Sequence, residues 1–299
     1  MGKVVFDVQY QTTLAFLISY YFYCTGLSAG SFMISTLSYG FGMSKFKPAS
    51  KMGVVAAVIL LLLAPQFLLM QVGWPIKSVW NHFVYLNPVS AMSYGAFLLM
   101  LYPINSIIYG IFMFRGNMKM TKIFGLIGIP MALSVHGYTG WILALGVARD
   151  YWNTGLMPIV FLFSAMVSGI SMMILLIMIR DRFFTAEKVI NDELIGSLAK
   201  LLGWLLAVDL FLVFCDYSVL LYSKLEAQEV AHFMLFGKMS FWFVIVENLI
   251  GKVIPMIIVM IPGMRRSYFW LVVAAVMNMV GILAMRIVTV YGGQAIPLM

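Results

Sequence analysis

The sequence predicts an all-α protein that crosses a membrane several times, built as one integral-membrane domain over residues 1–299. The chain is 63% hydrophobic and only 10% charged, with a mean hydropathy of +0.99. A soluble globular domain carries about 25% charged residues, so this composition excludes that class. Long apolar stretches recur along the whole chain, and the segments between them are too short to form a soluble domain.

Eight apolar stretches are long enough to be transmembrane helices, since a helix needs about 20 apolar residues to span the hydrocarbon core. They lie at residues 13–40, 52–70, 89–113, 123–146, 156–179, 195–222, 240–262 and 267–291. We expect the first and the sixth, which are the longest, to tilt or to extend beyond the lipid. The N-terminal segment lacks the basic region and cleavage site of a signal peptide, so we expect the first span to be retained.

The distribution of Lys and Arg predicts which side of the membrane each loop faces. The loops after the first, third, fifth and seventh spans carry eleven basic residues, whereas the opposite side carries five. Basic loops stay in the cytoplasm, and an even number of spans returns the chain to the side where it started. We therefore expect both termini outside, and we interpret the net charge of +8 as a result of topology, with no nucleic-acid partner.

The Cys and His content argues against a metal cofactor in this chain. Cys24 and Cys215 are the only cysteines, whereas an iron–sulfur cluster takes about four protein ligands, mostly Cys. His82 and His232 fall in predicted loops, so only His136 could ligate a transmembrane haem. We expect no haem, no iron–sulfur cluster and no other metal. Any electron transfer would then use a bound organic carrier and the metal centres of a partner.

Polar side chains inside the apolar spans are the candidates for a functional site, because each costs free energy in hydrocarbon unless it is paired or used. The position of each residue along its span gives its depth in the membrane, at a rise of ~1.5 Å per residue. Four spans each place one strongly polar side chain in the outer half of the membrane: His136, Asp216, Glu247 and Arg286. Three more are predicted near the midplane: Asp209, Lys252 and Asn278.

Structural interpretations of these residues remain open. Arg286 could extend to the outer surface or pair with Asp216 and hold two helices together. Asp209 and Lys252 share a depth and could form a structural ion pair. His136 could be an ordinary hydrogen-bonding residue between helices, and Tyr138 could be an ordinary buried tyrosine.

Small residues recur in two spans, as GlyLeuSerAlaGlySer (26–31) and AlaMetValSerGlyIleSer (165–171). The Gly26-x-x-x-Gly30 spacing favours close helix packing. The similarity of the two segments hints at an internal repeat of residues 1–150 and 151–299, which would form two four-helix bundles.

Five short motifs together resemble the NrfD family, the membrane subunits of polysulfide-reductase-like complexes that exchange electrons with quinones. The motifs are HGYTG (136–140), WNTGLMP (152–158), SAMVSG (164–169), TyrPheTyrCysThrGlyLeuSerAlaGlySer (21–31) and ArgIleValThrValTyrGlyGlyGln (286–294). They are spread over the whole chain, which makes the resemblance more specific than any one motif.

The resemblance implies a quinone- or quinol-binding membrane anchor subunit of a multi-subunit respiratory oxidoreductase in the inner membrane of a prokaryote. Its cofactor would be menaquinone or ubiquinone. It would exchange electrons with a ferredoxin-like iron–sulfur subunit on the outer face, itself joined to a soluble catalytic subunit that contains molybdenum. The protein would have membrane lipid around it and no metal catalytic centre of its own.

The resemblance also names residues for the quinone. Tyr138 matches the family position expected to contact a ring oxygen, and Gln11 stands where family members place Asn or His. With His136 and Arg286, these form the predicted quinone-binding set. On a helix, His136 and Tyr138 diverge by about 200°, so only one of them can face a given ligand atom.

Asp216, Glu247 and Asp209 form the predicted proton route, since carboxylates are natural proton acceptors. Glu247 and Lys252 depart from the family pattern. Two alternatives of other classes remain: a secondary transporter, favoured by midplane charges and by the Gly/Pro-interrupted segment 247–255, and a plain membrane anchor without quinone chemistry. The loop 72–88, with two Trp and one Tyr, is either an interfacial aromatic belt or a docking surface for the outer partner.

Overall fold

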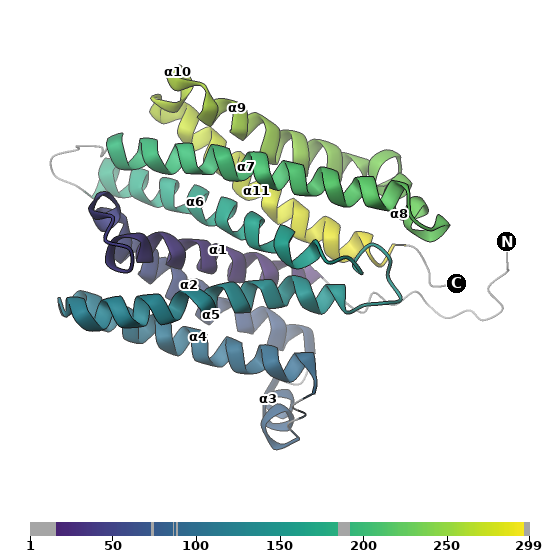
Figure 1. Ribbon diagram of the computed structural model, residues 1–299, viewed down its shortest axis with the longest axis horizontal. Helices are drawn as coiled ribbons and strands as arrows, with labels where there is room; N and C mark the ends of the chain where they lie inside the picture. Colours follow the sequence, from purple (N-terminus) through teal and green to yellow (C-terminus); the bar gives the residue numbers. More distant parts are fainter. Residues whose placement is uncertain (1–15, 73–74, 86, 88, 185–191, 296–299) are drawn as a thin grey trace.

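The structure is a computed structural model that describes residues 16–72, 75–85, 87, 89–184 and 192–295. These residues form a bundle of long helices that run side by side (Figure 1), and no strand occurs among them. The long helices are α1 (Phe16–Tyr39), α2 (Lys47–Val72), α4 (Ala91–Phe114), α5 (Met118–Ala144), α6 (Met157–Phe183), α7 (Asp192–Leu221) and α11 (Tyr268–Gly292). An eighth long segment joins the π-helix η2 (Phe241–Val253) to α9 (Ile254–Met260).

Within the part of the chain that the structure describes, seven helical segments are long and apolar enough to cross a membrane, and they match the second to the eighth predicted spans. The all-α, polytopic membrane architecture is therefore confirmed. The first predicted span corresponds to α1, which has 24 residues but is not one of the seven. The sidedness of the termini and the total of eight crossings stay predictions.

Burial explains why α1 is more polar than the other long helices. It packs against α2, α5, α6 and α11, so much of its surface faces protein rather than lipid. Its hydroxyl groups bond within the protein: Ser31 Oγ donates to the Leu27 carbonyl at 2.7 Å, and Ser35 Oγ to the Ser50 carbonyl at 2.7 Å. A helix surrounded by other helices can carry such side chains without exposing them to hydrocarbon.

Two pairs of glycines let helices touch backbone to backbone. A Cβ atom on Gly30 of α1 would lie 2.5 Å from the Ala165 carbonyl oxygen and 2.7 Å from the Cα of Gly169 in α6. A Cβ atom on Gly251 of η2 would likewise collide with the Cα of Gly281 in α11. The helix-packing interpretation of Gly30 is thus confirmed. The two small-residue segments that suggested a repeat pack against each other, while the repeat itself stays a prediction.

The start of α1 and the end of α11 lie at the same end of the bundle, called here the terminal end. Ser19 Oγ donates to the Arg286 carbonyl at 3.3 Å, and Trp152 Nε1 donates to the Thr289 carbonyl at 2.8 Å. The short helices α3 (Pro75–Val84) and α8 (Leu225–Phe236) also lie at this end. The short helix α10 (Pro262–Arg265) lies at the opposite end, called the α10 end (Figure 1), and the one-turn helix η1 (Ser44–Phe46) joins α1 to α2.

Sequence analysis did not find α3 or α8, which occupy two predicted loops. The predicted loop 72–88 contains α3, in which Trp80 is exposed, and Tyr85 directly after it is exposed as well. Its placement in the membrane interface stays a prediction.

The seventh predicted span is π-helical over 13 residues, which the sequence pattern did not indicate. The π-helix bonds each residue to the one five positions away, whereas α-helical geometry separates such residues by about 140° around the axis. Asn248 Nδ2 accordingly donates to the carbonyl of Phe243 at 2.8 Å. Glu247 and Lys252 are also five apart, so the π-helix brings them to one face. Such segments are rare and are often found at functional sites.

Gly30→Val should lower the stability of the purified protein, because added methyl groups would collide with the backbone of α6 rather than with a movable side chain. Overpacking of this kind costs about 1–3 kcal/mol. Thermal unfolding in detergent measures the loss. Gly155→Ala is the control, since nothing lies within 4 Å of a Cβ atom there. Equal melting temperatures for Gly30→Val and wild type would contradict the close crossing.

Candidate functional site

A buried cluster around Arg286 joins α5, α6 and α11 near the terminal end. The Nη2 atom of Arg286 donates to Ser164 Oγ at 2.6 Å and to the Phe161 carbonyl at 3.3 Å. The guanidinium carbon lies 4.0 Å from the centre of the Phe161 ring, a cation–π contact. Arg286 and His136 are both fully buried, and their side chains approach to 3.3 Å. The structure therefore brings together two of the predicted quinone-binding residues.

The hydrogen bonds assign the proton on His136. Its Nε2 atom lies 2.7 Å from the Phe161 carbonyl oxygen, which can only accept, so Nε2 carries the hydrogen and donates. The 3.3 Å approach of Arg286 is then a contact between two donors rather than a bond. His136 Nδ1 is buried and has no hydrogen-bond partner among the described residues, and the same holds for Nε and Nη1 of Arg286. The cluster therefore retains one unused acceptor and two unused donor atoms.

Arg286 does not pair with Asp216, and it does not reach the surface. Its side chain has no exposed area, and no carboxylate of the described residues forms an ion pair with it. Both structural interpretations of this residue are therefore wrong. The reason is that α6 packs against it and supplies neutral acceptors, Ser164 and the Phe161 carbonyl, in place of a carboxylate.

Tyr138 lies on the other side of α5. Its ring packs onto Gly95 of α4, where an added Cβ atom would collide with the hydroxyl-bearing edge of the ring, closest to Cζ. The side chain is half-buried, with Trp141 beside it at 6.4 Å between ring centres. No hydrogen bond joins its hydroxyl to another described residue. As its spacing predicts, Tyr138 faces away from His136, so the structure does not unite the predicted quinone-binding set.

Gln11, the fourth member of the predicted quinone-binding set, lies outside the described residues.

A second buried cluster lies near the middle of the bundle and joins α7 to η2. Lys252 Nζ lies 3.0 Å from Asp209 Oδ2 and 3.2 Å from Glu247 Oε1. All three side chains are buried. The suggested Asp209–Lys252 ion pair is therefore present, and Glu247 joins it, which the sequence did not indicate. Asp209 Oδ1 has no partner among the described residues.

The two clusters balance in charge. Arg286 and Lys252 carry two positive charges, and Asp209 and Glu247 carry two negative charges, so the four side chains sum to zero. Both carboxylates attract Arg286 electrostatically, although neither forms an ion pair with it. Unpaired charge in a membrane interior is costly, so this balance explains how Arg286 is tolerated without a contact partner of opposite charge.

Asp216 lies between the ion cluster and the terminal end, in α7. It is buried, with Thr154 beside its carboxyl group. The next residue, Tyr217, shares a hydrogen bond of 3.2 Å with Tyr151 and stacks on Phe243 of η2. These two tyrosines therefore lie in the region between Asp216 and Glu247.

Several residues of these clusters were not predicted. Ser164 begins a matched motif (164–169) that had given it no role, and Phe161 in α6 lies outside the matched motifs. Tyr151 and Trp152 come from the turn before α6, which motif matching included only in part. Asn278, predicted at the midplane, links helices by accepting from Ser171 Oγ and donating to the Gly251 carbonyl, each at 2.8 Å. Among the described residues, no three His, Cys, Asp or Glu side chains gather as a metal site.

Comparison with known proteins gives consistent results over nearly the whole chain. The family model "Polysulphide reductase, NrfD" matches residues 7–297. A selenate reductase subunit of Mesobacillus selenatarsenatis is 28% identical, over 94% of this chain and 74% of that protein. The Hdr-like menaquinol oxidoreductase integral membrane subunit of Archaeoglobus fulgidus is 26% identical, over 92% of this chain and 69% of that protein. A polysulfide reductase subunit of Wolinella succinogenes is 24% identical, over 93% of each sequence.

Arg286→Met should destabilise the folded protein, because it removes the shorter of the two hydrogen bonds of Ser164 and leaves the charge of the Lys252 cluster unbalanced. Losing partners for buried polar groups costs about 1–3 kcal/mol. Thermal unfolding of the purified protein in detergent measures this loss. Arg115→Met, at an exposed site after α4, is the matched control. An unchanged melting temperature for Arg286→Met would show that the contacts of this guanidinium group contribute little.

Proposed function

The chain belongs to the NrfD family of polysulphide reductases, and we propose that it is the subunit that binds quinone in a multi-subunit respiratory oxidoreductase of a prokaryotic inner membrane. The relatives are named as subunits of selenate reductase, polysulfide reductase and a menaquinol oxidoreductase, which supports an oxidoreductase subunit over the alternative of a secondary transporter. The observation that carries the quinone assignment is the Tyr138 side chain.

Tyr138 suits a quinone oxygen for three reasons. Its hydroxyl makes no bond to another described residue, so it is available as a donor. Its ring is held in place by Gly95 beneath it, which limits the positions the hydroxyl can take. Trp141 lies beside Tyr138, with 6.4 Å between the ring centres, and is exposed, so this apolar side chain would face the quinone ring or tail. Bound quinone would supply two-electron chemistry, and the residues of this chain would orient it.

His136 and Arg286 support this site from the other face of α5. Because they are fully buried and face α6 and α11, we place them behind the quinone rather than against it. His136 Nδ1 is an unused acceptor, which suits a proton acceptor reached through a water or through a small movement of α5. Arg286 would hold α5 in place, and His136 would receive a proton.

Electrons would pass between the quinone and an iron–sulfur subunit. Oxidation of one quinol releases two electrons and two protons. The partner must accept the electrons, and side chains or water must accept the protons. The terminal end offers exposed apolar side chains on or beside α3 and α8, namely Trp80, Tyr85, Leu225 and Phe236. We propose that the ferredoxin-like subunit docks there and carries electrons to or from a soluble molybdenum-containing subunit.

The protons would travel through Asp216 to the outside, with Tyr151 and Tyr217 between it and Glu247. The ion cluster at mid-depth would then be a structural element rather than part of a pumping route. Asp209, bound to Lys252 at 3.0 Å, closes the inward path in this arrangement. The same buried cluster is what a transporter or a pump would need, so proton movement in sealed vesicles decides between these possibilities.

Tyr138→Phe should lower quinol-linked turnover of the assembled complex by roughly ten-fold or more, because one hydrogen bond in a dry site is lost at about 1–3 kcal/mol. Assembly should persist, since the hydroxyl bonds to no described residue. Activity of the soluble subunits with artificial dyes should not change. Tyr39→Phe, at the far end of α1, is the control. Full quinol turnover in assembled Tyr138→Phe complex would refute the site and favour a plain anchor.

Asp216→Asn should slow quinol turnover while the complex still assembles. Asp209→Asn should instead reduce assembly, because removing one half of a buried ion pair costs about 3–5 kcal/mol. Turnover and proton movement in sealed vesicles measure both effects. An Asp209→Asn complex that assembles and turns over, yet loses transmembrane proton movement, would show that the mid-depth cluster is a proton path.

A further inference from the structure

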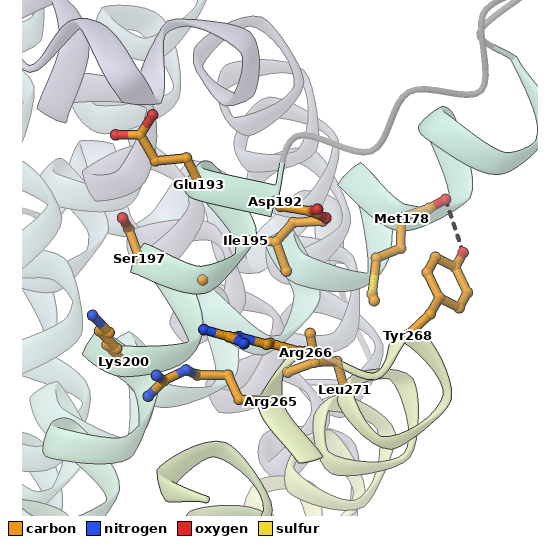
Figure 2. Close-up of a pocket in the computed structure, with 11 residues that line it drawn as sticks. Met178, Asp192, Glu193, Ile195, Ser197, Lys200, Arg265, Arg266, Tyr268 and Leu271 are labelled. Atoms are coloured by element: carbon orange, nitrogen blue, oxygen red, sulfur yellow. Dashed lines mark hydrogen bonds between the residues drawn. The ribbon is translucent and has the colours of Figure 1, made fainter. Parts of the chain in front are cut away.

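A cavity of about 410 Å³ lies at the α10 end, and neither Tyr138 nor any residue of the two buried clusters lines it. It is formed where the end of α6, the first turns of α7, α10 and the start of α11 meet (Figure 2). Its lining holds three cationic side chains, Lys200, Arg265 and Arg266. No role in quinone chemistry explains them.

The cations retain donor atoms for a ligand, because the one hydrogen bond found for them among the described residues is the long one from Arg265 Nη1 to the Val259 carbonyl, at 3.5 Å. Figure 2 shows Lys200, Arg265 and Arg266 on one side of the cavity, with Asp192 and Glu193 on the other. No ion pair joins any of the three cations to another described residue. The two acidic residues lie in the first turn of α7, where the helix dipole stabilises them without a cationic partner. Two guanidinium groups and one ammonium group around a single space are suited to a phosphate.

The surface beside the cavity is apolar and runs toward the middle of the membrane. Lys200 continues along one face of α7 into Trp204, Val208 and Phe211, spaced by four, four and three residues, and all three are exposed. At ~1.5 Å per residue, Phe211 lies about 16 Å from Lys200 along the helix. That length is close to one leaflet of a hydrocarbon core of about 30 Å. Ile257 and Ile261 on the neighbouring segment are exposed as well.

We propose that this cavity binds the headgroup of an anionic phospholipid of the phosphatidylglycerol type. The phosphate would lie against Lys200, Arg265 and Arg266. The glycerol hydroxyls would donate to Asp192 and Glu193, and an acyl tail would lie along Trp204 to Phe211. A free phosphate or nucleotide would satisfy the cations equally well, but the cavity adjoins the apolar, lipid-facing side of α7, where a bilayer lipid can reach it directly. The lipid would hold α7, α10 and α11 together at the α10 end.

Thermal unfolding of delipidated, detergent-purified protein tests this proposal. We expect dioleoyl phosphatidylglycerol to raise the melting temperature by about 3 °C. Dioleoyl phosphatidylcholine and inorganic phosphate should have little effect at the same concentration. An equal rise with phosphatidylcholine or phosphatidylethanolamine would overturn the preference for an anionic headgroup. An equal rise with inorganic phosphate would identify a soluble anion instead of a lipid.

The double variant Lys200→Gln/Arg266→Gln should lose the phosphatidylglycerol response, and Trp204→Ala should weaken it. The matched control is Arg115→Gln/Lys122→Gln, which removes two exposed cations elsewhere and should respond as wild type does. If the cavity variant proves too unstable to purify, native mass spectrometry of the wild-type protein still decides. Retained phosphatidylglycerol after partial delipidation supports the site, and retention of no phospholipid, or of zwitterionic lipid alone, contradicts it.

Discussion

The crossing of α1 and α6 at Gly30 and Gly169 is the contact on which the other features depend. With no side chain at either position, the two backbones meet, and α1 can lie among α2, α5, α6 and α11 rather than at the lipid surface. The same approach fixes the position of α5, because Gly26, one turn earlier in α1, leaves room for His136, whose Cε1 atom would lie 3.0 Å from a Cβ atom there. A larger residue at either level would move His136 away from the Phe161 carbonyl. Small residues thus set the geometry of the polar ones, as is common where the hydrophobic effect does not drive helices together.

Charge is distributed over the interior in a way that separates two tasks. Lys252 is held directly by Asp209 and Glu247, whereas Arg286 is held by neutral acceptors and is balanced only at a distance. The direct ion cluster lies near mid-depth and is closed by its own contacts. The Arg286 cluster lies nearer the terminal end and retains unused donors and one unused acceptor. Chemistry that exchanges protons needs groups of the second kind, so we assign the region behind Tyr138 to function and the region around Lys252 to structure.

The sequence was sufficient for the second to eighth spans because hydrophobicity over about 20 residues directly reflects the membrane thickness. It also placed Asp209 and Lys252 at one depth, since depth follows from position along a helix. The side of the helix on which each residue lies was harder to predict. The divergence of His136 and Tyr138 followed from α-helical spacing, but the meeting of Glu247 with Lys252 needed a π-helix that no residue pattern indicated. The pairing of Arg286 with Asp216 was wrong because depth alone cannot say which helices are neighbours. The amphipathic helix α3 lay in a segment too short to count as a span, so it was missed.

Mapping the attachment site of a photoreactive quinone tests the central claim most directly. An azidoquinone would be illuminated with the assembled complex, and the labelled peptides would be identified by mass spectrometry with and without excess natural quinone. The account predicts competed label on α4 and α5, in the peptides that contain Gly95 and Tyr138. Competed label on η2 or α11, near Lys252, would place the quinone at the ion cluster. That result would contradict the assignment of the region behind Tyr138 to function and of the region around Lys252 to structure.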